Sequence, residues 1–227
     1  MNKKLQTLKL HAIWLGALLA PCLASAQEAA PRWQVKLGYN LIDPKVSSGD
    51  LSAPSLPGTK VDVHQDESVI VTLGYAFTTH VSAEFFAGLP YRHNIVGDGA
   101  IKGVGKLGDT KQISPTLMLQ YRFFTPQDQV RPYVGAGVTY AYFYDERGSN
   151  VLTSMTNPGG EATLNNIDGA LGASMLAGIQ GNLSERWFID VGLVKTLVKT
   201  TSHLSTGQHI DIHLDPVSTN LSLGYRF

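Results

Sequence analysis

A period-two alternation of apolar and polar side chains dominates this sequence and limits the fold to one built from β-strands. In residues 33–41, for example, Trp33, Val35, Leu37 and Tyr39 share one parity, and polar residues or glycine occupy the other. This spacing puts the apolar side chains on one face of a sheet. The same alternation recurs in eight segments, residues 33–41, 68–77, 81–91, 116–123, 134–144, 171–180, 187–193 and 217–227. Most of them are close to the roughly nine to eleven residues that a tilted membrane-spanning strand requires.

The connections between these segments alternate between short and long. The short connections are residues 78–80, a stretch around 125–131, and residues 182–185. The long connections lie around residues 43–67, 93–112, 145–168 and 201–214. Outer-membrane barrels have short periplasmic turns and longer extracellular loops, whereas a soluble sandwich has no reason to sort its loops. We therefore predict an all-β fold, an eight-stranded antiparallel transmembrane β-barrel of the outer-membrane type.

The N-terminal segment has the features of a signal peptide. Three lysines within the first nine residues precede an apolar run over residues 12–20, and Ala-Ser-Ala at 24–26 is an A-x-A cleavage site. The apolar run is too short for a membrane anchor, which needs about 20 residues. We predict a cleaved signal peptide over residues 1–26 and a single barrel domain over 27–227. The one cysteine, Cys22, lies in the first segment, so no disulfide is expected in the mature domain.

Charge in the chain is scarce and balanced. There are 18 basic and 18 acidic side chains, and charged residues make up 16% of the sequence, compared with about 25% in soluble domains. The balance argues against a nucleic-acid-binding surface. The scarcity suits strands whose outer face meets lipid.

Aromatic residues gather at the two ends of the predicted strands. Those at the short-turn ends are Trp33, Tyr75, Phe77, Tyr121, Phe123, Trp187, Tyr225 and Phe227, and those at the long-loop ends are Tyr91, Tyr140, Tyr142 and Tyr144. Such rings form the two interfacial girdles of a membrane barrel. Lys195 falls near the outer girdle on the lipid-facing parity, where its ammonium group can reach lipopolysaccharide phosphates. The alternating C-terminal segment ends in Phe227, so Tyr225 and Phe227 resemble the signal read by the barrel assembly machinery.

Five short stretches resemble the OmpW family of outer-membrane proteins. They are Leu89-Pro-Tyr-Arg-His93, Ser114-Pro-Thr-Leu-Met118, Arg131-Pro-Tyr-Val-Gly-Ala-Gly137, Leu214-Asp-Pro216 and Gly224-Tyr-Arg-Phe227. They follow the family's order over most of the mature chain, although Val217 stands where the family often has an aromatic residue. The resemblance implies an eight-stranded barrel in the outer membrane of a Gram-negative bacterium, with a hydrophobic lumen associated with the passage of small apolar molecules.

The inward-facing side chains of the predicted barrel change from charged to apolar with distance from the short turns. Near the short-turn end they carry charges of both signs, which we expect to pair as a polar floor: Lys36, Glu84, Arg122, Asp190 and Arg226. Farther up they are apolar: Ile70, Phe86, Met118, Phe143, Leu176 and Val194. Eight strands enclose too little space for a water-filled porin, so this composition predicts a dry path for an apolar ligand, with tight core packing as the alternative. Under the family resemblance, Phe86 and Val194 match positions of a hydrophobic constriction.

Two prolines indicate a lateral exit. Pro90 lies near the outer end of the third predicted strand, and Pro115 begins the fourth. Neither residue can donate a backbone hydrogen bond, which central strands rarely tolerate. We expect strand pairing to open there and release an apolar molecule into the membrane. The alternative is that both prolines merely end their strands at a loop.

The signals for an enzyme or a metal site are weaker. His203-Leu204-Ser205 echoes the Ser/His pair of lipid-modifying barrels, but turn residues follow it, so a base and a nucleophile would not be held rigidly. His209, Asp211 and His213 share one parity as a possible metal pair, and exposed loop histidines are the simpler interpretation. We expect no enzyme, no metal and no cofactor.

The sequence thus predicts an outer-membrane barrel for passive passage of small hydrophobic molecules, with lipid, lipopolysaccharide and the barrel assembly machinery as further partners. It leaves one alternative open. In that alternative the barrel is structural, and its long loops bind a bacteriocin, a phage or a host surface.

Overall fold

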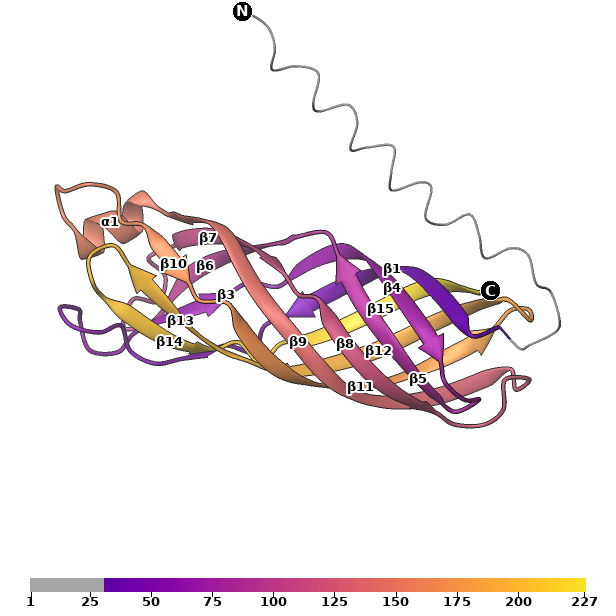
Figure 1. Cartoon of the computed structure of the whole chain (residues 1–227). Helices are drawn as coiled ribbons and strands as arrows, with labels where there is room; N and C mark the ends of the chain where they lie inside the picture. The colour runs from indigo at the N-terminus through magenta and orange to yellow at the C-terminus, as the bar shows by residue number, and fades with distance from the viewer. Residues whose placement is uncertain (1–30) are drawn as a thin grey trace, which may run out of the picture. The chain divides into compact units, whose positions relative to one another are not determined.

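The described part of the protein, residues 31–227 of the computed structural model, forms a closed β-barrel (Figure 1). The predicted signal peptide, residues 1–26, lies outside the described residues. The barrel strands are β1 (Trp33–Asp43), β4 (Asp66–Ala76), β5 (Val81–Gly88), β8 (Thr116–Arg122), β9 (Val130–Gly148), β11 (Ala170–Asn182), β12 (Trp187–Leu197) and β15 (Val217–Arg226). Each pairs antiparallel with its neighbours, and β15 returns to β1. The prediction of an eight-stranded antiparallel barrel is confirmed.

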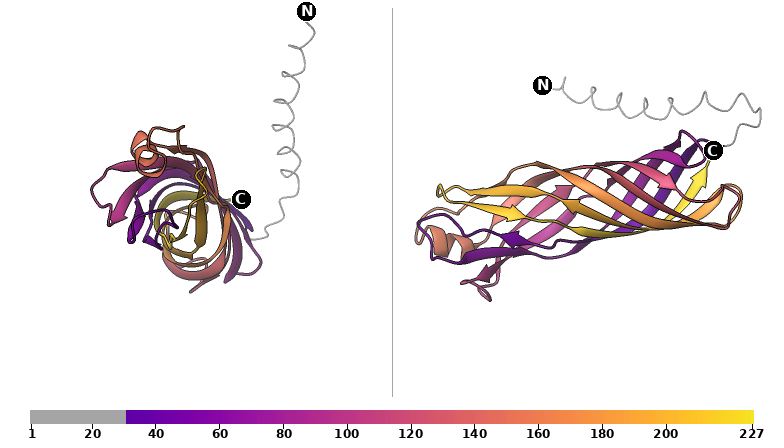
Figure 2. Two further views of the ribbon diagram at one scale, coloured as in Figure 1. Left: turned by 90° about the vertical axis from the view of Figure 1, so that its left-hand side faces the viewer. Right: turned by 90° about the horizontal axis from the view of Figure 1, so that it is seen from below.

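Three short connections join strands at the end of the barrel that holds the C-terminus (Figure 2). They link β4 to β5, β8 to β9 and β11 to β12, as the spacing of the alternating segments predicted. Two of them are tight: Phe77 N donates to Val81 O at 2.9 Å, and Leu183 N donates to Trp187 O at 2.9 Å. Short turns hold neighbouring strands in one register and leave no room for a folded loop at this end.

The alternation in sequence becomes an inside-out distribution of side chains. The outward residues Leu37 and Leu119 are 61% and 57% exposed, whereas the inward residues Lys36 and Glu84 are 2% and 0% exposed. An outward band of large apolar side chains around a polar interior is the pattern of a barrel whose outside faces lipid. Girdle rings pack at the short-turn end, where the ring centroids of Trp33 and Tyr75 lie 4.8 Å apart.

The four long connections are largely strands, so treating them as loops was wrong. They contain β2 (Ser47–Ser48), β3 (Thr59–Val63), β6 (Tyr91–Gly99), β7 (Lys106–Ile113), β10 (Asn165–Ile167), β13 (Lys199–Leu204) and β14 (His209–His213). Here β7, β6 and β3 continue the sheet from the long strand β9, and a second sheet runs β10-β13-β14-β2. We call this part the extension. Its outward residues Arg92, Asn94 and Asp211 are polar and exposed, which places the extension beyond the lipid-facing band.

A short helix, α1 (Asn150–Thr156), lies at the far end of the extension (Figure 1). The side chain of Ser149 caps it by accepting a hydrogen bond from Leu152 N. Within residues 31–227, no helix combines the length and apolarity needed to cross a membrane.

Candidate functional site

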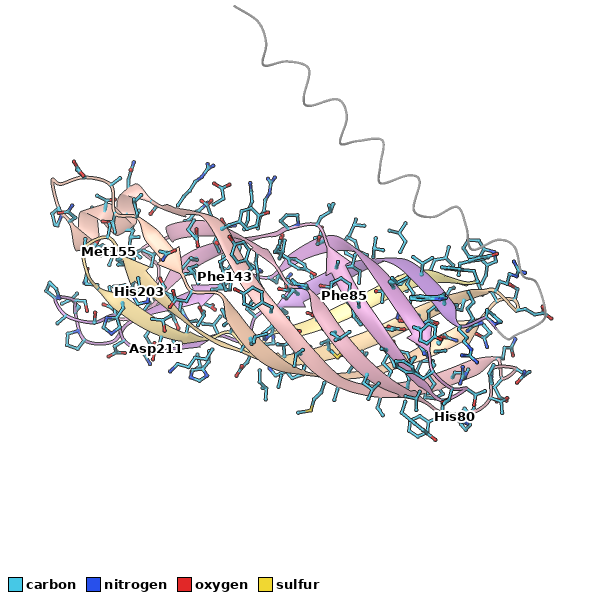
Figure 3. All side chains as sticks on the ribbon, viewed as in Figure 1. His80, Phe85, Phe143, Met155, His203 and Asp211 are labelled. Carbon is cyan, nitrogen blue, oxygen red and sulfur yellow. The ribbon has the colours of Figure 1, made fainter. Side chains whose placement is uncertain are left out.

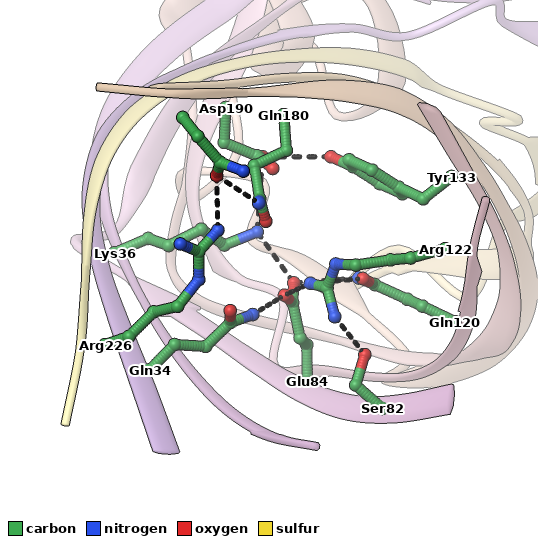
Figure 4. Close-up of polar contacts among 11 residues, drawn as sticks. Gln34, Lys36, Ser82, Glu84, Gln120, Arg122, Tyr133, Gln180, Asp190 and Arg226 are labelled. Carbon is green, nitrogen blue, oxygen red and sulfur yellow. Dashed lines mark hydrogen bonds and ion pairs between the residues drawn. The ribbon is translucent and has the colours of Figure 1, made fainter. Parts of the chain in front are cut away.

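A cluster of charged side chains fills the lumen near the short-turn end (Figure 4). We call it the ionic floor and define it as Lys36, Glu84, Arg122 and Asp190, which come from β1, β5, β8 and β12. Lys36 Nζ lies 2.7 Å from Glu84 Oε2 and 3.2 Å from Asp190 Oδ1. Arg122 Nη2 lies 2.6 Å from Glu84 Oε1. All four side chains are buried, so each charge depends on its partners rather than on water.

Neutral side chains add hydrogen bonds to the ionic floor, in which Arg122 Nε and Asp190 Oδ2 are buried without a partner among the described residues. Gln34 and Gln120 donate to the Glu84 carboxylate, the latter at 2.7 Å. The Tyr133 hydroxyl donates to Asp190 Oδ1 at 2.9 Å. A buried carboxylate is stable only with several donors around it, and Glu84 has four such partners.

Arg226, the fifth residue expected in the floor, lies apart from the other four. Its guanidinium donates to Asn182 Oδ1 at 2.6 Å and stands 4.5 Å from the centroid of the Phe188 ring. It contacts none of the four ionic-floor residues through a recorded ion pair among the described side chains. Its charge is therefore held by the β11–β12 end of the barrel.

An apolar layer lies directly above the ionic floor. Met118, Tyr133, Leu176 and Val194 form one buried cluster, with Phe86 packed against it. We call these five residues the constriction. Lys36 Nζ lies 5.4 Å from the centroid of the Phe86 ring, so the constriction and the floor are in contact. Four of the six predicted lumen residues, Phe86, Met118, Leu176 and Val194, are brought together here.

Ile70, Phe143 and Tyr133 are the three differences between the predicted path and the constriction. Ile70 is buried but lies outside the cluster. Tyr133 had no predicted role, although it shares the inward parity of β9 with Gly135 and Gly137. Its hydroxyl group fits because Gly178 faces it: a Cβ at Gly178 would lie 2.4 Å from the Tyr133 oxygen.

A belt of hydroxyl groups follows the constriction outward. Thr116 bonds to Thr139 at 2.7 Å, Thr139 to Ser174 at 2.7 Å, and Ser174 to Thr196 at 2.9 Å, all between side-chain oxygens. The chain crosses β8, β9, β11 and β12. The hydroxyls bond to one another, so the belt presents little unmet polarity to the lumen.

The largest apolar interior lies above this belt, inside the extension. Its buried residues are Ile95, Ile101, Leu107, Ala141, Phe143, Leu152, Ile167, Val198, Leu204, Ile210, Ile212 and Leu214. Among them only Phe143 was predicted to line the path. The sequence did carry a signal for others, because Ile210 and Ile212 alternate with the exposed His209, Asp211 and His213.

Two small cavities open within this apolar interior. The lower cavity has a volume of about 30 Å³ and is lined by residues that include Ile42, His93 and Phe143. The upper cavity has a volume of about 50 Å³, lies beside Leu152 of α1, and shares Ile95 and Ile212 with the lower one. A cavity of about 10–15 Å³ holds one water, so an organic ligand must displace side chains to enter.

The backbone ladder is interrupted beside the lower cavity. Pairing of β5 with β8 ends at Phe86 and Thr116, and pairing of β6 with β7 begins at Tyr91 and Gln112. We call the intervening residues, 87–90 and 113–115, the ladder break; Pro90 and Pro115 lie in its two sides. The backbone groups on the two sides of the break form their hydrogen bonds with other strands and not with each other.

The bonds at the ladder break run to the neighbouring strands. Leu89 N donates to Val69 O in β4 at 3.0 Å, and Tyr140 N in β9 donates to Pro115 O at 3.0 Å. No backbone hydrogen bond across the break is recorded for these described residues. At this height the two sides of the barrel wall are therefore not held together by a backbone ladder.

The polar side chains of the extension are engaged in surface contacts. Figure 3 places His203 and Asp211 at the opposite end of the barrel from His80. Asp211 pairs with Lys199 at 2.9 Å and accepts from Thr201 at 2.8 Å, and these two partners hold the pKa of its carboxyl below its usual value. His203 Nε2 lies 3.2 Å from Asp168 Oδ2. In residues 31–227, no group of three His, Cys, Asp or Glu side chains is arranged to hold a metal ion.

Two further predicted residues lie at the seam between β15 and its neighbours. Phe227 exchanges backbone hydrogen bonds with Trp33, at 3.2 Å and 2.9 Å. The Tyr225 ring meets Trp187 edge to face at 4.9 Å between centroids. At the outer girdle, the Lys195 ammonium donates to the backbone oxygen of Asp215.

Comparison with known proteins places the chain among outer-membrane barrels. Residues 30–227 match the OmpW family. The outer membrane protein W of Vibrio cholerae is 30% identical over 175 residues, which cover 74% of this chain and 77% of that protein. The dibenzothiophene metabolism operon protein PahQ of Pseudomonas aeruginosa is 24% identical over 212 residues, 91% of this chain and 94% of that protein. The crystal structure of the outer membrane protein OprG from Pseudomonas aeruginosa aligns with a TM-score of 0.77 at 26% identity, covering 87% of this chain and 96% of that one.

Proposed function

The chain belongs to the OmpW family and is an outer-membrane β-barrel of Gram-negative bacteria, not an enzyme; from this premise, we propose that it passes small hydrophobic molecules through its outer lumen and releases them sideways into the membrane. The observation that carries the proposal is the ladder break, which lies beside the lower cavity and above a filled constriction.

The lining of the outer lumen supports an apolar ligand. The extension encloses a continuous set of buried aliphatic and aromatic side chains, from Leu204 near the mouth to Phe143 and Leu214 beside the barrel. Sites for small molecules have this composition, with a few polar groups among apolar ones. The cavities are small at rest, so passage requires side chains to move aside.

The lower lumen opposes straight passage to the periplasm. A molecule that continued downward would have to part the constriction and then separate the ion pairs of Lys36 with Glu84 and Asp190. It would offer those charges no hydrogen bonds in return, and unpaired buried charges are costly. The hydrocarbon of the bilayer is the better solvent for such a molecule, and the ladder break is the opening nearest to it.

One relative's name agrees with this class of molecule. PahQ is described as a dibenzothiophene metabolism operon protein, and dibenzothiophene is an apolar aromatic heterocycle. We extend to this chain only the chemical class, a small hydrophobic compound.

An engineered disulfide across the ladder break tests the proposal. Leu89→Cys with Ile113→Cys places one thiol on each side of the break, on the outer face, in a barrel domain that lacks cysteine of its own. The matched control, Ala83→Cys with Leu119→Cys, joins the same two walls of the barrel where β5 and β8 are already paired. Ala83 and Leu119 are antiparallel partners within the reach of a disulfide, and Leu89 lies opposite Ile113 when the β5–β8 register is continued past Phe86 and Thr116.

Uptake of an apolar compound into cells carrying each variant is measured under oxidising and reducing conditions. We expect oxidation to block uptake only in the Leu89/Ile113 pair and reduction to restore it. Uptake that ignores the redox state of a fully formed Leu89/Ile113 disulfide would contradict lateral release. Uptake equal to that of cells lacking the barrel would favour the structural, partner-binding alternative.

A further inference from the structure

One polar atom faces the lower cavity without a hydrogen-bond partner among the described residues. It is Nε2 of His93, a side chain that is 2% exposed and contributes to the cavity lining. His93 lies on β6 two residues above Tyr91, where pairing resumes beyond the ladder break, and its ring stacks on the Tyr91 ring at 6.1 Å. The atom is therefore both inside the apolar interior and next to the break.

The hydrogen bond on the other side of the ring fixes what Nε2 can do. His93 Nδ1 lies 3.1 Å from the backbone oxygen of His64. A carbonyl oxygen only accepts, so Nδ1 must carry a proton. In the neutral ring, Nε2 is then an acceptor without a partner among the described residues, on a side chain that lines the cavity.

The surroundings of His93 favour the neutral ring. Burial lowers its pKa below the usual value, against smaller opposing effects of the His64 carbonyl, Asp66 and the nearby Gln112 side chain. At neutral pH the ring therefore has one donor, already used, and one free acceptor.

The other polar side chains of the lower cavity are engaged elsewhere. Thr200 donates to Asp168 O at 2.5 Å, and the Gln112 amide donates to Ser114 Oγ at 2.7 Å. Thr110 Oγ1 donates to backbone oxygens of its own strand and of β9. His93 Nε2 is thus an acceptor with which an incoming molecule can pair, and leaving such an acceptor unpaired in an apolar space is unfavourable.

We infer that His93 selects for hydrophobic molecules that carry one hydrogen-bond donor, such as a phenol, an aliphatic alcohol or a protonated acid, by accepting that hydrogen bond at Nε2 beside the ladder break. This inference rests on the proposed passage of hydrophobic molecules and specifies their class. A purely hydrocarbon compound of the same size leaves Nε2 unpaired and displaces any water from it, so it binds more weakly.

Three matched ligands test the inference on the full barrel in lipid nanodiscs. They are 1-naphthol, which has a donor; 1-methoxynaphthalene, which has the oxygen but no donor; and naphthalene. Binding is measured by calorimetry, with protein-free nanodiscs subtracted for partitioning into lipid. The wild type is expected to bind 1-naphthol about three- to tenfold more tightly than 1-methoxynaphthalene, the effect of one net hydrogen bond.

Substitutions at His93 should remove this preference. His93→Leu is expected to bring the affinity ratio to about one, and His93→Gln, which keeps an acceptor oxygen, to retain part of it. His209→Leu changes an exposed histidine outside the cavity and should keep the wild-type ratio. If His93→Leu does not fold, histidine-selective ¹⁵N NMR of the wild type decides: one ring nitrogen should shift with 1-naphthol and not with naphthalene.

Each contrary result has a distinct meaning. Binding of all three ligands without preference, or a preference that survives in His93→Leu, would overturn the role of His93 while leaving the hydrophobic lumen in place. Absence of binding for all three would overturn the proposed function and this inference with it.

Discussion

The two parts of the lumen use the inward faces of largely different strands, and they use them in opposite ways. Below, Glu84 and its partners fill the barrel with ion pairs and hydrogen bonds, and the constriction rests on them. Above, residues such as Ile95 and Ile212 line cavities in an apolar interior. Both arrangements leave little open space. The lower part does so with directional bonds that cannot yield without leaving charges unpaired, whereas the upper part does so with apolar contacts that can yield to a ligand.

Removing the central charge of the ionic floor should have the largest effect on stability. Glu84→Gln leaves Lys36 and Arg122 buried without their shared carboxylate, and breaking one side of a buried ion pair costs about 3–5 kcal/mol. Urea unfolding in lipid vesicles, followed by tryptophan fluorescence, measures the loss. Glu185→Gln, in the exposed β11–β12 turn, is the control and should stay within about 0.5 kcal/mol of wild type. Equal stability of the two variants would show that the floor is not held by its charges.

Truncating one buried side chain in each region sharpens the contrast. Met118 is 0% exposed and packed on all sides, so Met118→Ala should cost toward the upper part of the ~2–5 kcal/mol range for such changes. Ile212 already borders both cavities, so Ile212→Ala should cost about 2 kcal/mol or less, because fewer contacts are lost. The same unfolding assay compares them. A larger loss for Ile212→Ala would contradict the view that the extension is the yielding part.

A charge at the boundary of the two regions should reduce uptake without preventing folding. Phe86 sits at the last paired position below the ladder break. Phe86→Asp puts a carboxylate beside the exit, which should raise the free-energy barrier to passage of an apolar compound. About 1.4 kcal/mol of added barrier lowers the rate of passage tenfold. Uptake of an apolar compound is measured in cells with matched surface levels of heat-modifiable barrel. Phe86→Leu keeps an apolar side chain and should retain most of the uptake; equal uptake by Phe86→Asp would remove Phe86 from the path.

The smallest expected effect concerns assembly rather than either region of the lumen. Phe227→Ala keeps the backbone bonds to Trp33 and removes only the terminal ring. If the ring belongs to the assembly signal, the yield of folded barrel in the outer membrane should fall several-fold, because even a modest loss of folding efficiency changes the abundance of a protein several-fold. Phe77→Ala removes another exposed girdle ring and serves as the comparison. Similar yields for both variants would mean that Phe227 acts only as a girdle residue.

Much of the barrel follows from local sequence pattern. Parity along each strand assigned Lys36, Glu84, Arg122 and Asp190 to the inside and the leucines to the lipid, because a strand turns its side chains to alternate faces whatever its neighbours are. Short turns at 78–80 and 182–185 fixed the order of neighbouring strands. Some strands of the extension were missed because they are brief, as in the five residues of β14. Others, such as β7, were missed because polar residues occupy both parities and the register shifts along the strand.

What the sequence alone determined is which side chains face inward; how they meet was decided by closure of the barrel. Lys36 and Asp190 are 154 residues apart and touch only because β15 lies between β1 and β12. Arg226 has the same parity yet misses the floor, since the height of a residue in a closed, tilted sheet depends on the stagger of all strands together. The ladder break and the free Nε2 of His93 likewise arise from register between β6, β7 and their neighbours, and register is a property of pairs of strands that no single segment encodes.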